Sequence, residues 1–210
     1  MFVNFDRYKM PDAVLPHDCI SIDTLRLTKR PTQRKADVEE FFVHSMFTEP
    51  PSRLTRYSLF PFEFALDEMV MSRPPVDKGS KKVASFATRL DSTQYQFMQK
   101  LDQHLQDLLS SKLIHEAKFN WTPLMTDDGN INVHLPFNSW GQPSLPSFRR
   151  GTKERASIFH IKQGHTMRVV ISIGYMYCIH PDEIKNRTGT FQCGAMTTVK
   201  YIEIDESTPI

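Results

Sequence analysis

The side chains best suited to chemistry in this sequence are cations and aromatic rings in a Pro-rich stretch between positions 136 and 156. The stretch holds Trp140 and Phe148, and Trp121 precedes it. Its cations are Arg149, Arg150, Lys153 and Arg155. Phosphates attract cations and unstacked bases pack on flat rings, so this combination is typical of surfaces that bind single-stranded nucleic acid.

Charge is concentrated locally rather than spread over the whole chain. The net charge is only +2 at pH 7, which argues against a protein that coats nucleic acid with its entire surface. Between positions 149 and 168, in contrast, six cations accompany a single acid. We expect Lys162 and Arg168 to extend the same track, with weaker contributions from the loop pair Lys81 and Lys82. An ordinary solvated surface is the alternative explanation for such clusters.

Each aromatic side chain also has a structural interpretation. Trp121 stands at the start of an expected strand and could equally belong to the core, because Trp is usually well buried. Trp140 and Phe148 lie in a loop too polar to bury both, so at least one is expected to contact the ligand. Tyr175 and Tyr177 share a strand face with several branched apolar residues, and strand parity therefore predicts that they are core.

Nothing in the sequence matches an established catalytic or metal-binding pattern. There is no HExxH, GxSxG, Walker or GxGxxG motif. The pair Asp127-Asp128 precedes Gly129-Asn130 between two expected strands, which fits turn chemistry better than a catalytic carboxylate pair. The three cysteines lack zinc spacing and are expected to be reduced and buried, and Cys178 and Cys193 could approach each other on neighbouring strands. We therefore predict a noncatalytic protein that needs neither a metal nor a cofactor.

One helix is expected to pack against the sheet that carries these side chains. Apolar residues recur at helical spacing between about 92 and 112, which predicts an amphipathic scaffold helix capped at Ser92 or a neighbouring polar residue. Upstream, an alternating segment near 20–27 predicts an edge strand, and acids followed by aromatic residues predict a short helix over 37–44. Positions 74–82 are expected to form a polar, cationic loop.

After the helix, apolar residues alternate with a period of two. The expected strands cover 119–124, 131–135, 157–161, 166–178, 190–193 and 196–204. The first two are predicted to form a hairpin around the turn at 127–130, the next two a second hairpin, and the last two to complete about five strands. Gly174 suits a bulge or a sharp bend. The loop at 136–156 between the hairpins is long, and such loops are usually functional or disordered.

The bulk composition favours one domain with an extension, because 210 residues with 40% hydrophobic content can bury one core. We expect an N-terminal extension over 1–50, with an edge strand and a short helix, that mediates oligomer contacts, and a nucleic-acid-binding domain over 51–210. No segment approaches the roughly 20 apolar residues that span a bilayer, and the first residues do not resemble a signal peptide. The expectation is an intracellular, soluble protein with no membrane partner.

Four segments carry a resemblance to a known family: Trp121-Thr122-Pro123, Ile161-Lys162-Gln163-Gly164, Thr166 to Cys178, and Phe191 to Val199. Their order resembles an OB-type barrel, and residues 119–204 look like the C-terminal half of single-stranded DNA-binding proteins from large eukaryotic DNA viruses. The resemblance implies an α+β, mainly β fold: an OB-type, five-stranded, partly open barrel with one packing helix and an N-terminal extension. It also implies sequence-tolerant binding of single-stranded DNA in viral replication or repair, without metal or cofactor, in the host nucleus or a viral replication compartment, with replication proteins as candidate partners.

Two alternatives stay open. A viral structural or assembly protein that binds other proteins through the Pro-rich loop would have a similar composition. RNA is not excluded as the ligand either, because discrimination from DNA depends on contacts to the 2′-hydroxyl that composition does not show. Salt-sensitive binding of oligo-dT is the expectation that separates a nucleic-acid binder from an assembly protein.

Overall fold

The computed structural model describes residues 16–28, 32–35, 38–45, 62–78, 81–113, 118–135, 145–152, 154–157, 161–180 and 190–205. At 32–35, 44–45, 74–78 and 81–83 only the backbone is described. The 3-10 and α-helices are η3 (His17–Cys19), η4 (Ile22–Thr24) and α1 (Thr93–Ser110). The strands are β1 (Leu25–Leu27), β2 (Thr32–Lys35), β3 (Val38–Ser45), β4 (Phe62–Lys78), β5 (Lys81–Ala87), β6 (Phe119–Thr122), β7 (Asn130–His134), β8 (Ser147–Arg149), β9 (Thr166–Ile179) and β10 (Phe191–Ile204).

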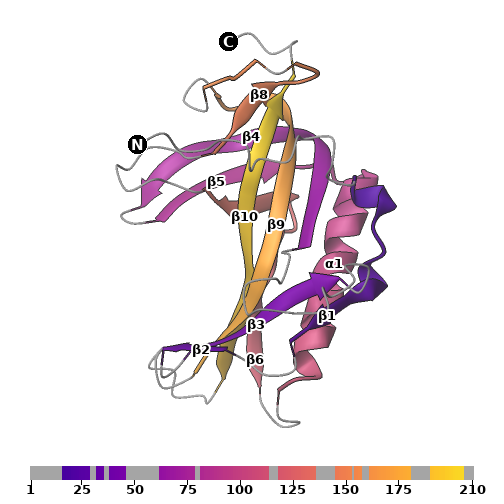
Figure 1. The fold of residues 1–210 in the computed structure, drawn as a ribbon, viewed down its shortest axis with the longest axis vertical. Coiled ribbons are helices and arrows are strands. Elements are labelled where there is room, and N and C mark those ends of the chain that lie inside the picture. The colour runs from indigo at the N-terminus through magenta and orange to yellow at the C-terminus, as the bar shows by residue number, and fades with distance from the viewer. Residues whose placement is uncertain are drawn as a thin grey trace, which may run out of the picture.

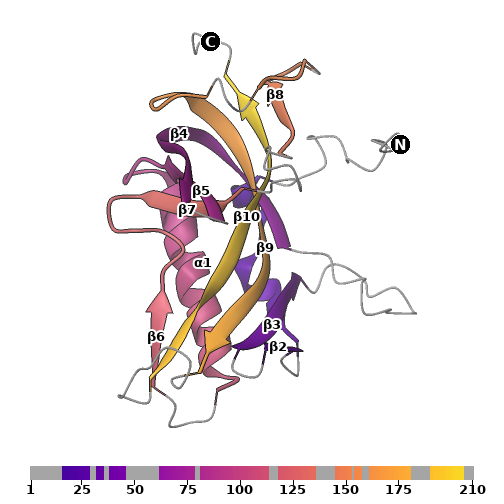
Figure 2. The ribbon, with the colours of Figure 1, turned by 90° about the vertical axis from the view of Figure 1, so that its left-hand side faces the viewer.

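The long antiparallel pair β9–β10 runs along the longest axis of the molecule (Figure 1). Their register extends from Met167 opposite Ile204 to Ile179 opposite Gln192. Other strands attach to each half: β4 and β8 pair with one end, and β3 and β6 pair with the other. Figure 2 shows β3 and β6 on opposite sides of this pair. The two ends of the β9–β10 hairpin therefore pair with different strands.

Five strands of this mixed sheet close into a ring. From β9 the pairing passes through β4, β5 and β7, reaches β10 at Thr198 opposite His134, and returns to β9. The β7–β10 contact is parallel, and the other four are antiparallel. In space β9, β4, β5 and β7 have the order 4-1-2-3 of a Greek key. The expectation of a mainly β protein with one packing helix and a barrel-like sheet is confirmed at this level.

Helix α1 forms where its periodicity predicts. Its N-cap is Ser92, whose side-chain oxygen accepts a hydrogen bond from the backbone N–H of Tyr95. The residues that α1 buries against the sheet are Phe97, Met98, Leu101, Leu105 and Leu109. Among the described residues, no helix has the length and the apolar character needed to cross a membrane.

The segment expected to be a short helix at 37–44 is strand β3, so that prediction is wrong. Val38, Phe41, Phe42 and Val43 have high strand propensity, and β3 pairs with β1 on one side and β9 on the other. These ladder partners outweigh the weak helix signal from the acids that begin the segment. Part of the predicted N-terminal extension is thus a strand of the main sheet.

Two predicted loops also contain strands. Positions 74–78 and 81–82 belong to the paired strands β4 and β5, and the register shifts between Arg73 and Val76, around the two prolines. The stretch at 136–156 contains β8, which pairs in parallel with the end of β10. Local polarity suggested loops at both places, but an available sheet edge supplies hydrogen-bond partners that the local sequence does not reveal.

The two predicted hairpins around the C-terminal strands are wrong in their pairing. The turn at 127–130 forms, with Gly129 at φ 78° and a single bridge between Met125 and Ile131. Beyond that bridge, β6 pairs with β10 and β7 pairs with β5. The predicted strand at 157–161 is not a strand at its described residues, Ser157 and Ile161, and 158–160 lie outside the described ranges. The last two predicted strands are one, β10.

Cys178 and Cys193 lie opposite each other on β9 and β10, as expected, with their sulfur atoms 3.2 Å apart. Both are buried in the core. The hydrogen bond from Cys193 and burial together raise the pKa of the Cys178 thiol. These two thiols therefore pack the core, whereas Cys19 is exposed, so the expectation that all three cysteines are buried is wrong for Cys19.

Candidate functional site

A bulge at Gly174 exchanges the two faces of β9. Ile173 lies opposite Thr197 and Tyr175 lies opposite Met196, which leaves Gly174 without a register partner on β10. One extra residue reverses the alternation of side chains beyond it. Before the bulge the odd-numbered positions 167 to 173 belong to the main core cluster, with Val170 and Ser172 buried on the other face, whereas after it Met176 and Cys178 belong to the main cluster. The bulge predicted at Gly174 is confirmed, and the prediction that the two following tyrosines are core is wrong.

Tyr175 and Tyr177 are half-buried on the face of the sheet opposite the buried Met176 and Cys178, which join the core cluster that includes α1. They line an open groove of about 410 Å³, which we call the tyrosine groove. Strands β3, β7, β9 and β10 and the end of β6 contribute to its walls. Its polar lining includes Thr122, Asn132, His134 and Gln192.

Several contacts fix the walls of the tyrosine groove. The ring of Tyr175 meets that of Phe42 edge to face, with centroids 6.3 Å apart. Gln192 donates from Nε2 to Oγ1 of Thr122 at 2.8 Å. Asn132 accepts at Oδ1 from the hydroxyl of Ser85 at 2.5 Å, which holds its amide on β7. The groove is consequently built from side chains with defined positions.

The tyrosine groove is nearly neutral. Its described lining contains one acid, Glu40, which is buried, and no lysine or arginine. Its chemistry is therefore stacking on aromatic rings and hydrogen bonding to uncharged polar groups, rather than neutralisation of phosphates.

The arginines of the basic run lie at the other end of β10, in an ion-paired set that we call the charged cluster. It consists of Asp67, Arg150, Arg168, Glu203 and Asp205. Arg150 contacts Asp67 at 2.7 Å and Asp205 at 3.0 Å, and the hydrogen bond that its guanidinium donates to Asp205 raises the pKa of Arg150. Arg168 contacts Glu203 at 3.3 Å and Asp67 at 3.7 Å.

Asp67 is the centre of the charged cluster because a second bulge places it there. The β4–β9 register shifts between Leu66 and Met69, and Glu68 has φ 52°. The backbone carbonyl of Asp67 also accepts a hydrogen bond from Gln94 of α1. The cluster thus ties β4, β9, β10 and the turn after β8 together, and its arginines are engaged in holding the fold.

The other predicted cations and rings of this region are more exposed or lie outside the described residues. Arg149 pairs with Glu154 at 3.5 Å, and Phe148 is half-buried and forms an isolated antiparallel bridge with Arg155. Lys162 is exposed. Trp140 and Lys153 lie outside the described residues, and for Lys81 and Lys82, on β5, only the backbone is described.

Trp121 faces α1 rather than the tyrosine groove. Its indole N–H donates to Oδ1 of Asp102 at 3.0 Å, and the same oxygen accepts from the backbone N–H of Leu124 at 2.8 Å. Burial raises the pKa of Asp102, although both hydrogen bonds act in the opposite direction. Trp121 is half-buried against the core, which agrees with the structural interpretation that the sequence left open.

The structure does not bring Trp121 together with the arginines. Trp121 pairs with Cys193 and Arg149 pairs with Ile204, at opposite ends of β10 (Figure 1). These partners are eleven residues apart on one strand, which corresponds to roughly 35 Å. The single surface expected from the sequence, with Trp121 beside Arg149 and Arg150, is therefore not formed.

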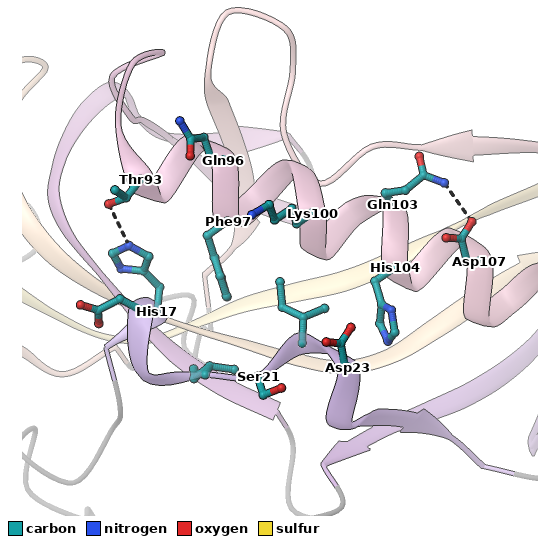
Figure 3. A pocket seen from close by; sticks show the side chains of 13 residues that line it. His17, Ser21, Asp23, Thr93, Gln96, Phe97, Lys100, Gln103, His104 and Asp107 are labelled. Carbon is teal, nitrogen blue, oxygen red and sulfur yellow. Dashed lines mark hydrogen bonds between the residues drawn. The ribbon is translucent and has the colours of Figure 1, made fainter.

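A larger hollow, of about 660 Å³, lies between α1 and the segment that contains η3 and η4 (Figure 3). His17 reaches from η3 to Thr93, with 3.3 Å between Nε2 and Oγ1, and His104 points from α1 toward η4. Its lining includes three acids and one lysine, Asp18, Asp23, Asp107 and Lys100. Among the described residues no group of three or more potential ligands could hold a metal ion. The excess of acids makes this hollow unsuitable for a polyanion.

A scan against protein-family models finds no match for the chain, and a search of curated protein sequences finds none either.

Proposed function

We propose that this protein binds single-stranded nucleic acid, DNA in the first instance, without catalysis and without strong sequence preference. The observation that carries the proposal is the tyrosine groove: two half-buried aromatic rings in an open, walled groove on a small closed sheet. Base stacking on aromatic side chains contributes roughly 1–3 kcal/mol per base and tolerates any sequence.

The topology supports an OB-type barrel as the finer description of the fold. An OB-fold is a five-stranded, partly open Greek-key barrel. Here a Greek key of β9, β4, β5 and β7 is closed by β10, and the ring is weakest at the single β7–β10 register pair. Asn132 and His134, which line the tyrosine groove, belong to the third strand of that ring. OB-folds bind oligonucleotides on the face that includes this strand.

The proposed interface differs from the one that the sequence favoured. Tyr175 and Tyr177 replace Trp121 as the stacking residues, because Trp121 is hydrogen bonded to Asp102 on the helix side. Exposed cations such as Lys162 remain candidates for phosphate contacts outside the groove. The setting that we propose, viral DNA replication or repair inside the host cell, rests on the resemblance of residues 119–204 alone.

A second candidate function is protein binding in an assembly. The observation in its favour is electrostatic: no lysine or arginine lines the described part of the groove, and Arg150 and Arg168 are already paired with acids. Aromatic and Met side chains such as Tyr175, Tyr177 and Met196 are enriched in protein interfaces.

Titration of the purified protein with fluorescently labelled oligo-dT at two salt concentrations tests the proposal. We expect micromolar or tighter binding of the wild type, and a loss of roughly 5- to 150-fold in affinity for Tyr175→Ala. Tyr95→Ala is the matched control, because Tyr95 is a half-buried tyrosine on α1, outside the groove. Its affinity should stay within twofold of the wild type.

Two outcomes would reject nucleic-acid binding through the groove. The first is no binding of oligo-dT at low salt, and self-association of the protein in the same buffer would then favour the assembly function. The second is equal loss of affinity in Tyr175→Ala and Tyr95→Ala, which would show that the change reflects folding rather than contact.

A further inference from the structure

We infer that Tyr177 is the stacking platform of the tyrosine groove, that Gly194 positions its ring, and that the ligand of this site is an unpaired nucleobase rather than a phosphate. This inference rests on the proposed function and makes it specific. It is carried by the space above Gly194, which the ring of Tyr177 occupies.

Tyr177 and Gly194 are direct cross-strand partners on β9 and β10. A Cβ atom built on Gly194 would lie 2.6 Å from Oη and 2.9 Å from Cζ of Tyr177. Cα atoms of antiparallel partners are about 4.5–5.5 Å apart, so the tip of the ring has crossed that distance sideways. The ring therefore lies across β10 rather than standing up from the sheet.

Thr122 bounds the far end of the ring. It pairs with Gly194 from the other side, on β6, and its Cβ lies 3.2 Å from the same built position. The Thr122 hydroxyl is in turn held by Gln192. The tip of Tyr177 thus sits over Gly194 and against Thr122, while the half-buried residue still lines the groove.

A ring in this position can stack a base at little entropic cost, because its orientation is fixed before the ligand arrives. The volume of about 410 Å³ is within the usual range of ligand sites. The described lining offers amide and hydroxyl groups that can hydrogen bond to base edges, at Asn132, Thr122 and Gln192, and no cation for a phosphate. These features select the base as the recognised group.

An aromatic ring that covers a strand glycine also has a purely structural use, since it shields the exposed backbone. The two roles differ in what a substitution changes. A structural role affects the unfolding midpoint, whereas a platform affects the affinity for bases in a protein that still folds.

Gly194→Ala tests the positioning role, because the added methyl group must displace the tip of Tyr177. We expect at least a fivefold loss of affinity for oligo-dT. Gly174→Ala is the matched control: it is a glycine on the same hairpin, its φ lies outside the left-handed range so that alanine can keep the bulge, and a Cβ there meets no atom within 4 Å. Its affinity should stay within twofold of the wild type. Equal affinities in the two variants would overturn the role of Gly194.

Two substitutions of Tyr177 keep the test valid where Gly194→Ala fails to fold. Tyr177→Leu retains an apolar cover over Gly194 but has no ring face, and should lose affinity to the same extent with little change in the unfolding midpoint. Tyr177→Phe retains the ring and should bind within twofold of the wild type. A Leu variant that binds like the wild type would contradict the platform.

An abasic oligonucleotide of the same length separates the base from the backbone. We expect oligo-dT to bind and the abasic strand, which keeps every phosphate, to bind at least tenfold more weakly. Equal binding of the two strands would overturn this inference while the proposed function stands. Binding of neither strand would reject the proposed function and this inference together.

Discussion

The charged cluster and the tyrosine groove occupy the two ends of the β9–β10 hairpin, and they differ in the kind of contact that their side chains make. In the charged cluster, Arg168 is 14% exposed and Arg150 is 41% exposed, and both arginines contact acids from neighbouring segments. In the groove, Tyr175 and Tyr177 have defined positions but open onto solvent. The arginines of the charged cluster are held in ion pairs that support the fold, whereas the tyrosine rings line an open groove.

A cluster of charge in a sequence thus predicts a cluster of charge in space, but it does not predict whether those charges can bind a ligand. The acids that pair with Arg150 come from β4 and from the end of β10, far away in sequence. An arginine whose fork is already bonded to two carboxylates has little to offer a phosphate, because a new contact would have to replace existing ones. Substitutions at either end of the β9–β10 hairpin test this difference.

The largest effect on stability is expected at the charged cluster. Asp67→Ala removes a partner of both Arg150 and Arg168 and should lower the free energy of unfolding by about 2–3 kcal/mol, because hydrogen bonds to charged groups are strong and Arg168 is well buried. Urea denaturation measures the change. At temperatures where the variant is folded, its affinity for oligo-dT should equal that of the wild type.

Asp91→Ala is the control for this prediction. The Arg89–Asp91 pair is a salt bridge of 3.1 Å whose side chains are 76% and 73% exposed. Removing it should leave the free energy of unfolding nearly unchanged, because exposed ion pairs contribute little to stability. Equal costs for Asp67→Ala and Asp91→Ala would show that the charged cluster does not hold the barrel end together.

A smaller effect on stability is expected at Asp102, which contacts Trp121 near the groove end of the hairpin. Burial raises its pKa above the ordinary value of 3.8, so the folded state holds the proton more tightly than the unfolded state. The stability that the protonated carboxyl contributes is therefore fully present below pH 3.8 and is lost as the pH rises through the raised pKa. Asp102→Asn keeps an acceptor for Trp121 and Leu124 without the charge, and should change stability at pH 7 by about 1 kcal/mol or less.

The measurement for Asp102 is the free energy of unfolding of wild type and Asp102→Asn between pH 3 and 7. The wild type should lose stability relative to the variant as the pH rises, since only the wild type ionises at this position. A difference that does not vary with pH, or one of opposite sign, would contradict the assigned burial of the carboxyl.

The sequence predicts the fold more successfully than the site, because periodicity and capping depend on near neighbours whereas strand pairing does not. The spacing of Phe97, Leu101 and Leu105 and the cap at Ser92 depend on near neighbours only, so α1 was predictable. The alternation in β9 was equally clear. Pairing of β6 with β10 and of β3 with β9 depends on edges made available by distant strands, which no local pattern contains.

The misassignment of Tyr175 and Tyr177 had a visible signal. Gly174 already suggested a bulge, and a bulge reverses the faces of every residue after it. A strand-face count that ignores the bulge assigns both rings to the core. A count that restarts after Gly174 assigns them to the opposite face. The pairing of Trp121 with Asp102 had no such signal, because the two residues approach only when α1 packs on β6.

The most direct test of the account is to locate the contact itself. Oligo-dT carrying 5-iodouracil at single positions can be photocrosslinked to the wild-type protein and the attached residues identified by mass spectrometry. We predict crosslinks at Tyr175 and Tyr177. In Tyr177→Leu, the crosslink at position 177 should be lost. Crosslinks concentrated at Trp121, or at Phe148 beside the charged cluster, with none at the two tyrosines, would contradict this prediction.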